Sequence, residues 1–244
     1  MKETLLTIGE AAARLGVSIN TLRLWDKKGI LNPFRPTPSS YRYYRESDLE
    51  RFIKKNDLVS AARDWVFGSS VDKPESLSYS QTRDTFQARI EHLQSELISA
   101  GADEKTASLV TAIAGEIGNN SFDHNLGNWP DVPGIFFAYD VNQSQVVLAD
   151  RGQGILKTLR RVKPKLKNHS LALKTAFTEI ISGRAPEARG NGLKFVRQIV
   201  TGDNAIRLQY QTGNALLHLQ PGDQAIKIQK SPAAFRGCMA VITF

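Results

Sequence analysis

Two polar side chains in the middle of the chain have the types and the spacing that phosphate chemistry needs. Glu116 and Asn120 lie four residues apart in a segment that the apolar pair Ile113 and Ile117 predicts to be helical. Residues at this spacing share one helix face, so the carboxylate could polarise a water while the carboxamide oxygen binds Mg²⁺. An exposed polar stripe would explain this segment, taken alone, equally well.

A second segment has the residues of a purine-binding turn. Asp150 follows the apolar run Val146–Ala149 and precedes Gly152 and Gly154. The pattern predicts a buried strand that ends in a carboxylate, which could accept a hydrogen bond from a purine exocyclic amine. The glycines would let the ring approach the backbone closely. A tight turn after any strand produces the same letters, so this motif is weak by itself.

A third segment places glycines before a helix. Gly190 and Gly192 precede an amphipathic stretch that runs to about Val200. Such a helix directs free backbone amides at an anion. The segment is not a Walker loop, because Gly-Lys-Ser/Thr is absent, nor a dinucleotide fingerprint, because the third glycine is missing.

In this order and spacing, the three segments resemble the N box and the two glycine boxes of the GHKL superfamily of ATPases. The resemblance spans roughly residues 82–244 and includes a closing strand entered through Gly237. It implies a Bergerat-type α/β sandwich, with a mixed sheet covered on one face by helices, and ATP and Mg²⁺ as cofactors. It also implies a general base at Glu116, a magnesium ligand at Asn120 and an adenine contact at Asp150.

The same resemblance implies a larger nucleotide site and a lid over it. The implied nucleotide-binding residues are Asn120, Asp123, His124, Asp150, Gly152, Gly154, Ile155, Arg189, Gly190, Gly192, Leu193 and Lys194. The lid would span residues 156–189, with a helix near Leu171–Ile181. Asp123 stands where many histidine kinases carry a phosphate-contacting lysine, so Arg189 or Lys194 is expected to make that contact instead.

The N-terminal segment predicts a helix-turn-helix. Thr7 and Ser18 have the residue types that cap helices, and the helices would span Ile8–Leu15 and roughly Asn20–Lys28, joined by Gly-Val-Ser. The second helix would present a polar outer face to DNA, with an arginine for base edges and lysines for phosphates. The candidate DNA contacts on this helix are Asn20, Thr21, Arg23, Lys27 and Lys28.

A ribbon follows, because three prolines in residues 32–38 forbid a helix and the tyrosines up to Tyr44 favour extended chain. It would form a wing with DNA contacts at Arg35, Arg42 and Tyr43. Ser47 is expected to cap a third helix.

These motifs keep the order of the winged helix-turn-helix of the MerR superfamily, which they resemble over about the first 55 residues. Leu24-Trp25-Asp26 stands where MerR proteins usually have Tyr-Tyr-Glu, so the resemblance points to the excisionase-like branch. Effector binding and promoter twisting are therefore not implied. The alternative is a winged domain that serves protein–protein contact only.

Charge and composition support a division into two domains. Residues 1–56 carry eleven Lys and Arg against six Asp and Glu, a net charge of +5, whereas the other 188 residues carry a net +3. We predict a DNA-binding domain over 1–56, a connecting helix and linker over 57–81, and an ATP-binding domain over 82–244. An apolar stripe within residues 82–100 is either core-facing or a dimer seam.

The resulting prediction is an α+β, cytoplasmic, ATP-responsive transcriptional regulator that binds double-stranded DNA, as a homodimer, and no membrane. The chain would bind Mg-ATP and either hydrolyse it slowly as an ATPase or act as a protein-serine kinase of the anti-sigma-factor type on a STAS-like partner. A non-catalytic, nucleotide-gated interaction module is the third alternative. The single cysteine, Cys238, excludes an intramolecular disulfide and a cysteine zinc cluster.

Overall fold

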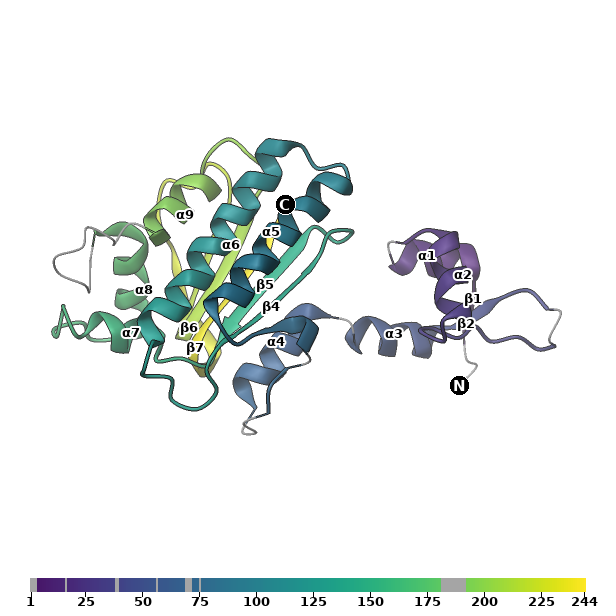
Figure 1. Cartoon of the computed structure of the whole chain (residues 1–244), viewed down its shortest axis with the longest axis horizontal. Coiled ribbons are helices and arrows are strands. Elements are labelled where there is room, and N and C mark those ends of the chain that lie inside the picture. Colours follow the sequence, from purple (N-terminus) through teal and green to yellow (C-terminus); the bar gives the residue numbers. More distant parts are fainter. Residues whose placement is uncertain are drawn as a thin grey trace. The chain divides into compact units, whose positions relative to one another are not determined.

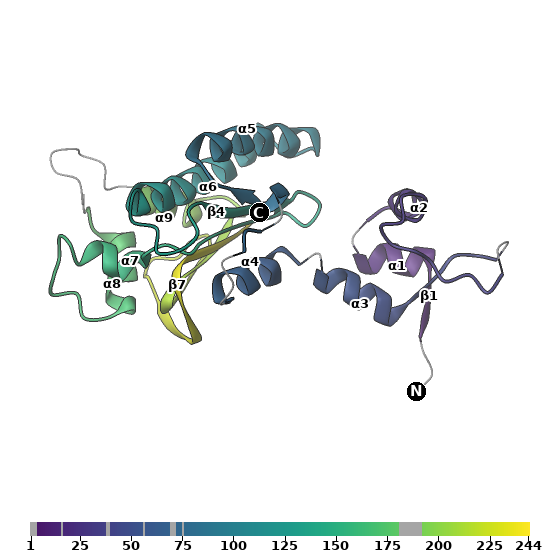
Figure 2. The same ribbon diagram turned by 60° about the horizontal axis from the view of Figure 1, so that its bottom comes forward.

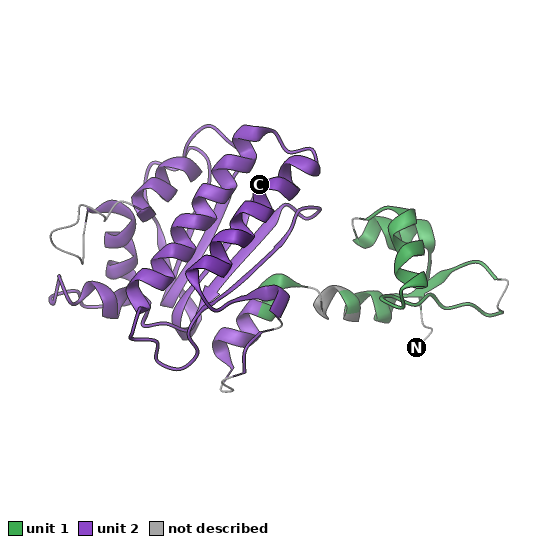
Figure 3. Cartoon of the chain, in the orientation of Figure 1, with its two compact units in different colours: residues 1–61 green, residues 62–244 purple. Residues whose placement is uncertain are grey.

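The computed structural model describes residues 4–15, 17–37, 40–55, 57–68, 72–74, 76–180 and 192–244. The chain divides into two compact units, residues 1–61 (unit 1) and residues 62–244 (unit 2), which are coloured separately in Figure 3. Both helices and strands contribute to the described part, which confirms the α+β fold class. No helix in these ranges is long and apolar enough to cross a membrane.

The described residues of unit 1 form three complete helices, the start of a fourth and a short ribbon. Helices α1 (Ile8–Leu15) and α2 (Ile19–Lys27) form the predicted pair. Thr7 and Glu10 cap α1 reciprocally: the Thr7 amide donates to the Glu10 carboxylate at 2.7 Å, and the Glu10 amide donates to Thr7 Oγ1 at 3.3 Å. Ser18 Oγ accepts from the Thr21 amide at 3.0 Å, which confirms its predicted capping role.

The ribbon has a partner that the sequence did not indicate. Strand β1 (Leu5–Thr7) pairs antiparallel with β2 (Tyr43–Arg45), and Phe34 forms an isolated bridge with Tyr43. Helix α3 (Glu46–Lys55) begins directly after β2, so Ser47 lies in its first turn and was wrongly predicted to be its cap. The core of unit 1 consists of Ala11, Ala12, Leu22, Leu31, Tyr44 and Leu49.

Unit 2 contains an antiparallel sheet with strand order β3-β4-β5-β7-β6 in the described residues. The strands are β3 (Tyr79–Ser80), β4 (Ile135–Asp140), β5 (Gln145–Asp150), β6 (Arg207–Leu219) and β7 (Ile228–Thr243). Every pairing between them is antiparallel, so the predicted mixed sheet was wrong in this respect.

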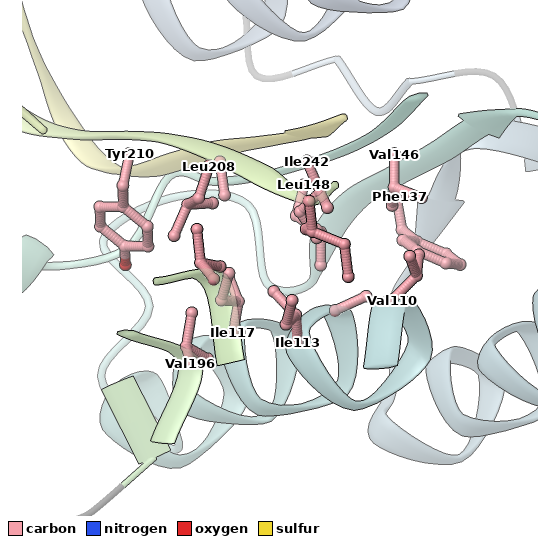
Figure 4. Packing of buried hydrophobic residues seen from close by; sticks show 14 of the residues in the cluster. Val110, Ile113, Ile117, Phe137, Val146, Leu148, Val196, Leu208, Tyr210 and Ile242 are labelled. Carbon is pink, nitrogen blue, oxygen red and sulfur yellow. The ribbon is translucent and has the colours of Figure 1, made fainter. Parts of the chain in front are cut away.

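Helices α5 (Arg83–Ser99) and α6 (Glu104–Asn125) cover one face of this sheet, as Figures 1 and 2 show. The apolar stripe of α5 is buried in the shared core, which confirms the core-facing interpretation of that stripe: Phe86, Ile90, Leu93 and Leu97. Figure 4 shows Val110, Ile113 and Ile117 of α6 directed at strand residues such as Leu148 and Ile242. This packing holds α6 in place along the sheet.

The described residues add three further helices to unit 2: α7 (Gly154–Leu159), α8 (His169–Thr178) and α9 (Gly192–Val200). Helix α8 corresponds to the helix predicted within the lid. Its Phe177 ring packs edge-on against Tyr210 of β6, with centroids 5.4 Å apart. Helix α8, within the segment predicted to be a lid, is therefore packed on the sheet core, and residues 181–191 of that segment lie outside the described ranges.

The opposite face of the sheet is covered in part by α4 (Leu58–Phe67). Trp65 packs against Phe136 and Tyr79, with ring centroids 6.5 and 6.2 Å apart, whereas the neighbouring Phe137 faces α5. The prediction placed helices on one face only, and it placed residues 79–80 in a linker. The part of α4 from Ala62 on and strand β3, which follows a 3-10 turn at Ser76–Ser78, belong to the packed part of unit 2.

Candidate functional site

Helix α6 is the element around which the three predicted segments of unit 2 meet. Its apolar side is buried against the sheet, and its polar residues near the C-terminal end face the other segments. Ser121 Oγ donates to Asp150 Oδ2 at 2.8 Å, and Asn125 Oδ1 accepts from the Gln153 amide at 2.8 Å. The end of α6 therefore holds the turn that follows strand β5.

Asp150 is the buried carboxylate of this arrangement. It ends β5, is 2% exposed, and accepts from the Gly152 amide through Oδ1 at 2.8 Å as well as from Ser121. Burial raises the pKa of Asp150, while the hydrogen bonds from Ser121 and the backbone oppose that shift. Each carboxylate oxygen retains acceptor capacity, so the group can take a further donor from a ligand.

The glycines around Asp150 have a steric reason for being glycines. A methyl group at Gly152 would overlap the Asn125 side chain, and one at Gly237 would overlap the Asp150 carbonyl oxygen. Gly154 and Gly237 also have positive φ angles of 71° and 98°, which favour glycine. The predicted importance of these positions therefore has a structural basis, whether or not a ligand binds.

The start of α9 lies beside the predicted chemistry on α6. A methyl group at Gly192 would overlap the Glu116 carboxylate and would lie 3.3 Å from Asn120 Nδ2. The predicted base, the predicted magnesium ligand and the first residue of the glycine-preceded helix are thus neighbours. Arg189 and Gly190 of the same motif lie outside the described residues.

A pocket opens between α6, α7, α8, α9 and strands β5 to β7. Six of the predicted nucleotide-binding residues line it: Asn120, His124, Asp150, Gly154, Ile155 and Leu193. The lining also includes residues that the sequence analysis missed: Ser121, Asn125, Thr158, Leu159, Ala176, Tyr210 and Cys238. Apolar walls with a buried carboxylate and a few amides at one end have the character of a small-molecule site.

The other predicted residues lie near this pocket without lining it. Gly152 shapes the turn beneath it, Glu116 lies against Gly192, and Lys194 is half-buried on α9. Asp123 forms an ion pair with Arg83 of α5. This pair attaches the carboxylate to the helix layer, where it fills the role of an interhelical contact.

The missed residues differ in how far the sequence could have indicated them. Ser121 and Asn125 are one turn apart on α6, beside residues already singled out, so helical spacing could have included them. Tyr210 and Cys238 come from β6 and β7, far along the chain. Burial raises the pKa of the Cys238 thiol to about 12, with the charge of Asp150 acting in the same direction. The thiol is therefore a neutral wall of the pocket at neutral pH.

Thr212 connects the pocket floor to the sheet, and it too was missed. Its Oγ1 donates to the Gly237 carbonyl at 2.9 Å and accepts from the Ile155 amide at 3.3 Å. The hydroxyl thereby couples strand β7 to the start of α7. Together with Ser121 and Asn125, it fixes the backbone around Asp150 before any ligand arrives.

In unit 1, helix α2 exposes most of the predicted DNA contacts. Asn20, Arg23, Lys27 and Lys28 are exposed, whereas Thr21 is half-buried. Arg23 Nη1 donates to Asn20 Oδ1 at 3.1 Å, a contact that orients the guanidinium along the helix surface. A positively charged, exposed helix of this kind can enter a DNA groove.

The wing arginines are joined to the end of α2 through Asp26. Arg35 Nη2 and Arg42 Nε donate to Asp26 Oδ2 at 2.5 and 2.8 Å. All three side chains are at least half-buried. These arginines were predicted to contact DNA, and the pairing with Asp26 was not predicted. Tyr43 is also half-buried, in the ribbon formed by β1 and β2.

Two helices joined by a short turn, followed by a ribbon, define unit 1 as a winged helix-turn-helix. Residues 7–44 match the family model described as "MerR family regulatory protein". The N-terminal unit is therefore a MerR-family helix-turn-helix domain.

Curated relatives agree with this assignment. The chain is 28% identical over 130 residues to the "Mercuric resistance operon regulatory protein" of Shigella flexneri, covering 46% of the chain and 90% of that protein. It is 41% identical over 56 residues to the "Probable heavy metal-dependent transcriptional regulator" of Haemophilus influenzae, covering 22% of the chain and 44% of that protein. The second match therefore spans less than half of its relative's length.

Proposed function

We propose that the chain is a DNA-binding transcriptional regulator whose unit 2 binds Mg-ATP and thereby controls the DNA-binding activity of unit 1. The DNA-binding part of the proposal is supported by the family match of residues 7–44, by the two relatives and by the exposed basic face of α2. The nucleotide part is supported by one observation above all: a fully buried carboxylate, Asp150, at the floor of a largely apolar pocket.

The pocket suits a purine base. Ile155, Leu159 and Leu193 offer apolar surface to a ring, while Asp150 offers an acceptor to an exocyclic amine. A buried acceptor of this kind discriminates against bases that lack the amine, because the carboxylate would then remain desolvated without compensation. Adenine and guanine both carry such an amine, and the resemblance of these segments to the GHKL ATPases selects adenine.

The phosphates would extend from this pocket toward the start of α9. Glu116, Asn120 and Gly192 are neighbours there, and the amides of the first turn of α9 can bind an anion. The described residues contain no group of three or more His, Cys, Asp or Glu side chains able to hold a metal ion alone. A magnesium ion held by Asn120 would therefore complete its coordination with phosphate oxygens and water, which is its usual manner of binding.

Calorimetry with the full chain and a non-hydrolysable ATP analogue tests the proposal. We expect magnesium-dependent binding that favours adenine over guanine nucleotides, and a change in affinity for a selected duplex between the two nucleotide states. Absence of heat with every nucleotide would refute the nucleotide part and leave the DNA-binding part to be judged separately. DNA affinity that does not depend on nucleotide would refute the switch alone.

The position of Glu116 allows a test of turnover. If the carboxylate activates water, Glu116→Ala should retain ATP and lose hydrolysis by a factor on the order of 10²–10⁴. Asn120→Ala should instead lose the magnesium dependence of binding. A wild-type chain that binds ATP without hydrolysis or phosphotransfer would support the nucleotide-gated module and remove the proposed role of Glu116.

A further inference from the structure

The near-neutral charge of unit 2 conceals a strongly basic segment. Residues 157–174 contain seven Lys and Arg and no Asp or Glu. They run from α7 through a connecting loop into α8, at the end of unit 2 where Figures 1 and 2 both show these two helices together. Like charges at this density repel one another unless partners within the protein, counterions or a bound polyanion neutralise them.

This segment is a built scaffold, since apolar contacts and hydrogen bonds hold it in place. Leu156, Leu166 and Ala172 form a buried cluster that joins α7, the loop and α8. Arg160 donates to the carbonyl oxygens of Leu166 and Lys167 at 2.9 and 3.2 Å, and Asn168 caps α8. The loop between the helices therefore presents its side chains from a fixed backbone.

The cations of the segment fall into two groups. Three have partners within unit 2: Arg160 with the loop carbonyls, Arg161 with Gln153, and Lys163 with Glu179. The others are exposed and, within the described residues, have no acidic partner: Lys157, Lys165, Lys167 and Lys174, which we call the basic ledge. Burial of Leu166 between Lys165 and Lys167 anchors the loop that carries the middle of the ledge.

We propose that the basic ledge is a second DNA-contact surface, which binds phosphates of double-stranded DNA without reading sequence. Lysines act on phosphate as point charges, so the ledge suits a repeating polyanion better than a ligand that needs fixed geometry. DNA is the polyanion that the helix-turn-helix in unit 1 brings to this chain. The inference goes beyond the proposed function because it assigns unit 2 a DNA contact of its own.

The test compares two sets of substitutions that remove the same charge from the nucleotide-free full chain. One variant combines Lys165→Gln, Lys167→Gln and Lys174→Gln, and its control combines Lys105→Gln, Lys227→Gln and Lys230→Gln, which are exposed outside the ledge. Fluorescence anisotropy on a random-sequence duplex gives the affinity across several salt concentrations. Each lost phosphate contact lowers the logarithmic salt slope by about 0.9, so the ledge variant should be shallower by about two to three.

The control triple variant should retain a slope within about one of wild type. A variant with Lys→Arg at the three ledge positions keeps the charge and should therefore have the wild-type slope. Equal slopes for the ledge and control variants would overturn the proposal, because net charge alone would then explain the loss. A ledge variant that loses ATP affinity but no DNA affinity would also overturn it and assign the lysines to the nucleotide. Tighter binding to double-stranded RNA than to DNA, lost in the ledge variant, would overturn the choice of DNA.

This outcome is separable from that of the proposed function. Arg23→Ala tests sequence preference through unit 1, and ATP calorimetry tests the pocket. If either of those tests fails while the ledge variant still has a shallower salt slope than its control, the DNA contact of unit 2 holds independently of the proposed function.

Discussion

The polar side chains of the two units are engaged in different ways. In unit 1 the candidate DNA contacts bind other side chains near the surface, as Arg23 does with Asn20 and Arg42 with Asp26. In unit 2 several polar side chains around the pocket bind backbone groups of other segments, as Asn125 does with Gln153 and Thr212 with Gly237. Unit 1 therefore has an adaptable surface, whereas the pocket of unit 2 is pre-organised.

This difference predicts how each region responds to substitution. A pocket whose backbone is held by buried side chains should fail abruptly when one close contact is violated. A surface of long, partly exposed side chains should lose function in small steps, because each contact is screened by solvent. The following substitutions test that contrast in order of decreasing expected effect.

The largest effect is expected at Gly237, where the turn beneath Asp150 leaves no room for a side chain. Gly237→Ala introduces a methyl group into the Asp150 carbonyl oxygen at a positive φ of 98°, so unfolding of unit 2 should become easier by about 3 kcal/mol. Gly222→Ala is the matched control: φ is 81° and nothing lies within 4 Å, so the loss should be about 1 kcal/mol. Denaturant unfolding measures both, and equal losses would contradict a tightly held pocket.

The next effect is expected at Asp150 and has two parts, one on ATP affinity and one on the stability of the fold. Asp150→Asn should weaken binding of an ATP analogue by about 1–3 kcal/mol, because one acceptor for the amine becomes a donor. Stability without nucleotide should not fall at neutral pH, since the substitution removes a desolvated charge and Ser121 can accept as well as donate. Calorimetry and denaturant unfolding measure the two parts, and unchanged ATP affinity in a folded variant would contradict the adenine assignment.

The same residue sets a pH dependence with a definite sign. Burial raises the pKa of Asp150 above its ordinary value of 3.8, so folding favours the protonated carboxyl. The stability it contributes is fully present below that ordinary value and is lost as pH rises through the raised pKa. As pH rises through this window, the Asp150→Asn variant should therefore become progressively more stable relative to wild type.

How far the sequence could predict these two regions depends on how local their contacts are. The helix-turn-helix could be predicted because its caps and helices lie in one continuous stretch, as the Thr7 and Ser18 caps show. Asp150 and its glycines could be predicted because a strand followed by a tight turn leaves a local pattern. The order of those motifs also indicated an α+β domain.

What the sequence could not predict depends on distant partners. Alternation along β6 places Tyr210 and Thr212, which are two residues apart, on the same face of the strand, but it does not show that this face borders a pocket. The pairing of Asp26 with wing arginines needs the tertiary fold, since nothing local selects one acid for two bases. Packing of Trp65 on Phe136 likewise follows from the sheet, so the second covered face was missed.

In unit 1, Arg23 should show a moderate effect on specificity. Arg23→Ala removes an exposed guanidinium from α2, so preference at one base position should fall by roughly 1–3 kcal/mol if the contact is bidentate. Within the described residues Arg23 forms one side-chain hydrogen bond, to Asn20 on an exposed surface, so the stability of unit 1 should change little. Anisotropy on a selected site and on its single-base variants checks this, with Lys28→Ala as a control that weakens all duplexes alike.

The smallest effect is expected at Asp26, whose carboxylate pairs with both wing arginines of unit 1. Asp26→Asn keeps the shape of the side chain and removes the charge that Arg35 and Arg42 share, so unit 1 should lose about 1 kcal/mol or less of stability. The freed arginines should steepen the logarithmic salt slope of DNA binding by up to about one, whereas Arg42→Ala should make it shallower by about one.

Glu50→Gln is the charge-matched control, because its carboxylate pairs with Arg14 away from the wing. Salt titrations in which Asp26→Asn and Glu50→Gln shift the slope equally would show that the wing arginines do not contact phosphate. The adaptable surface of unit 1 would then be limited to helix α2.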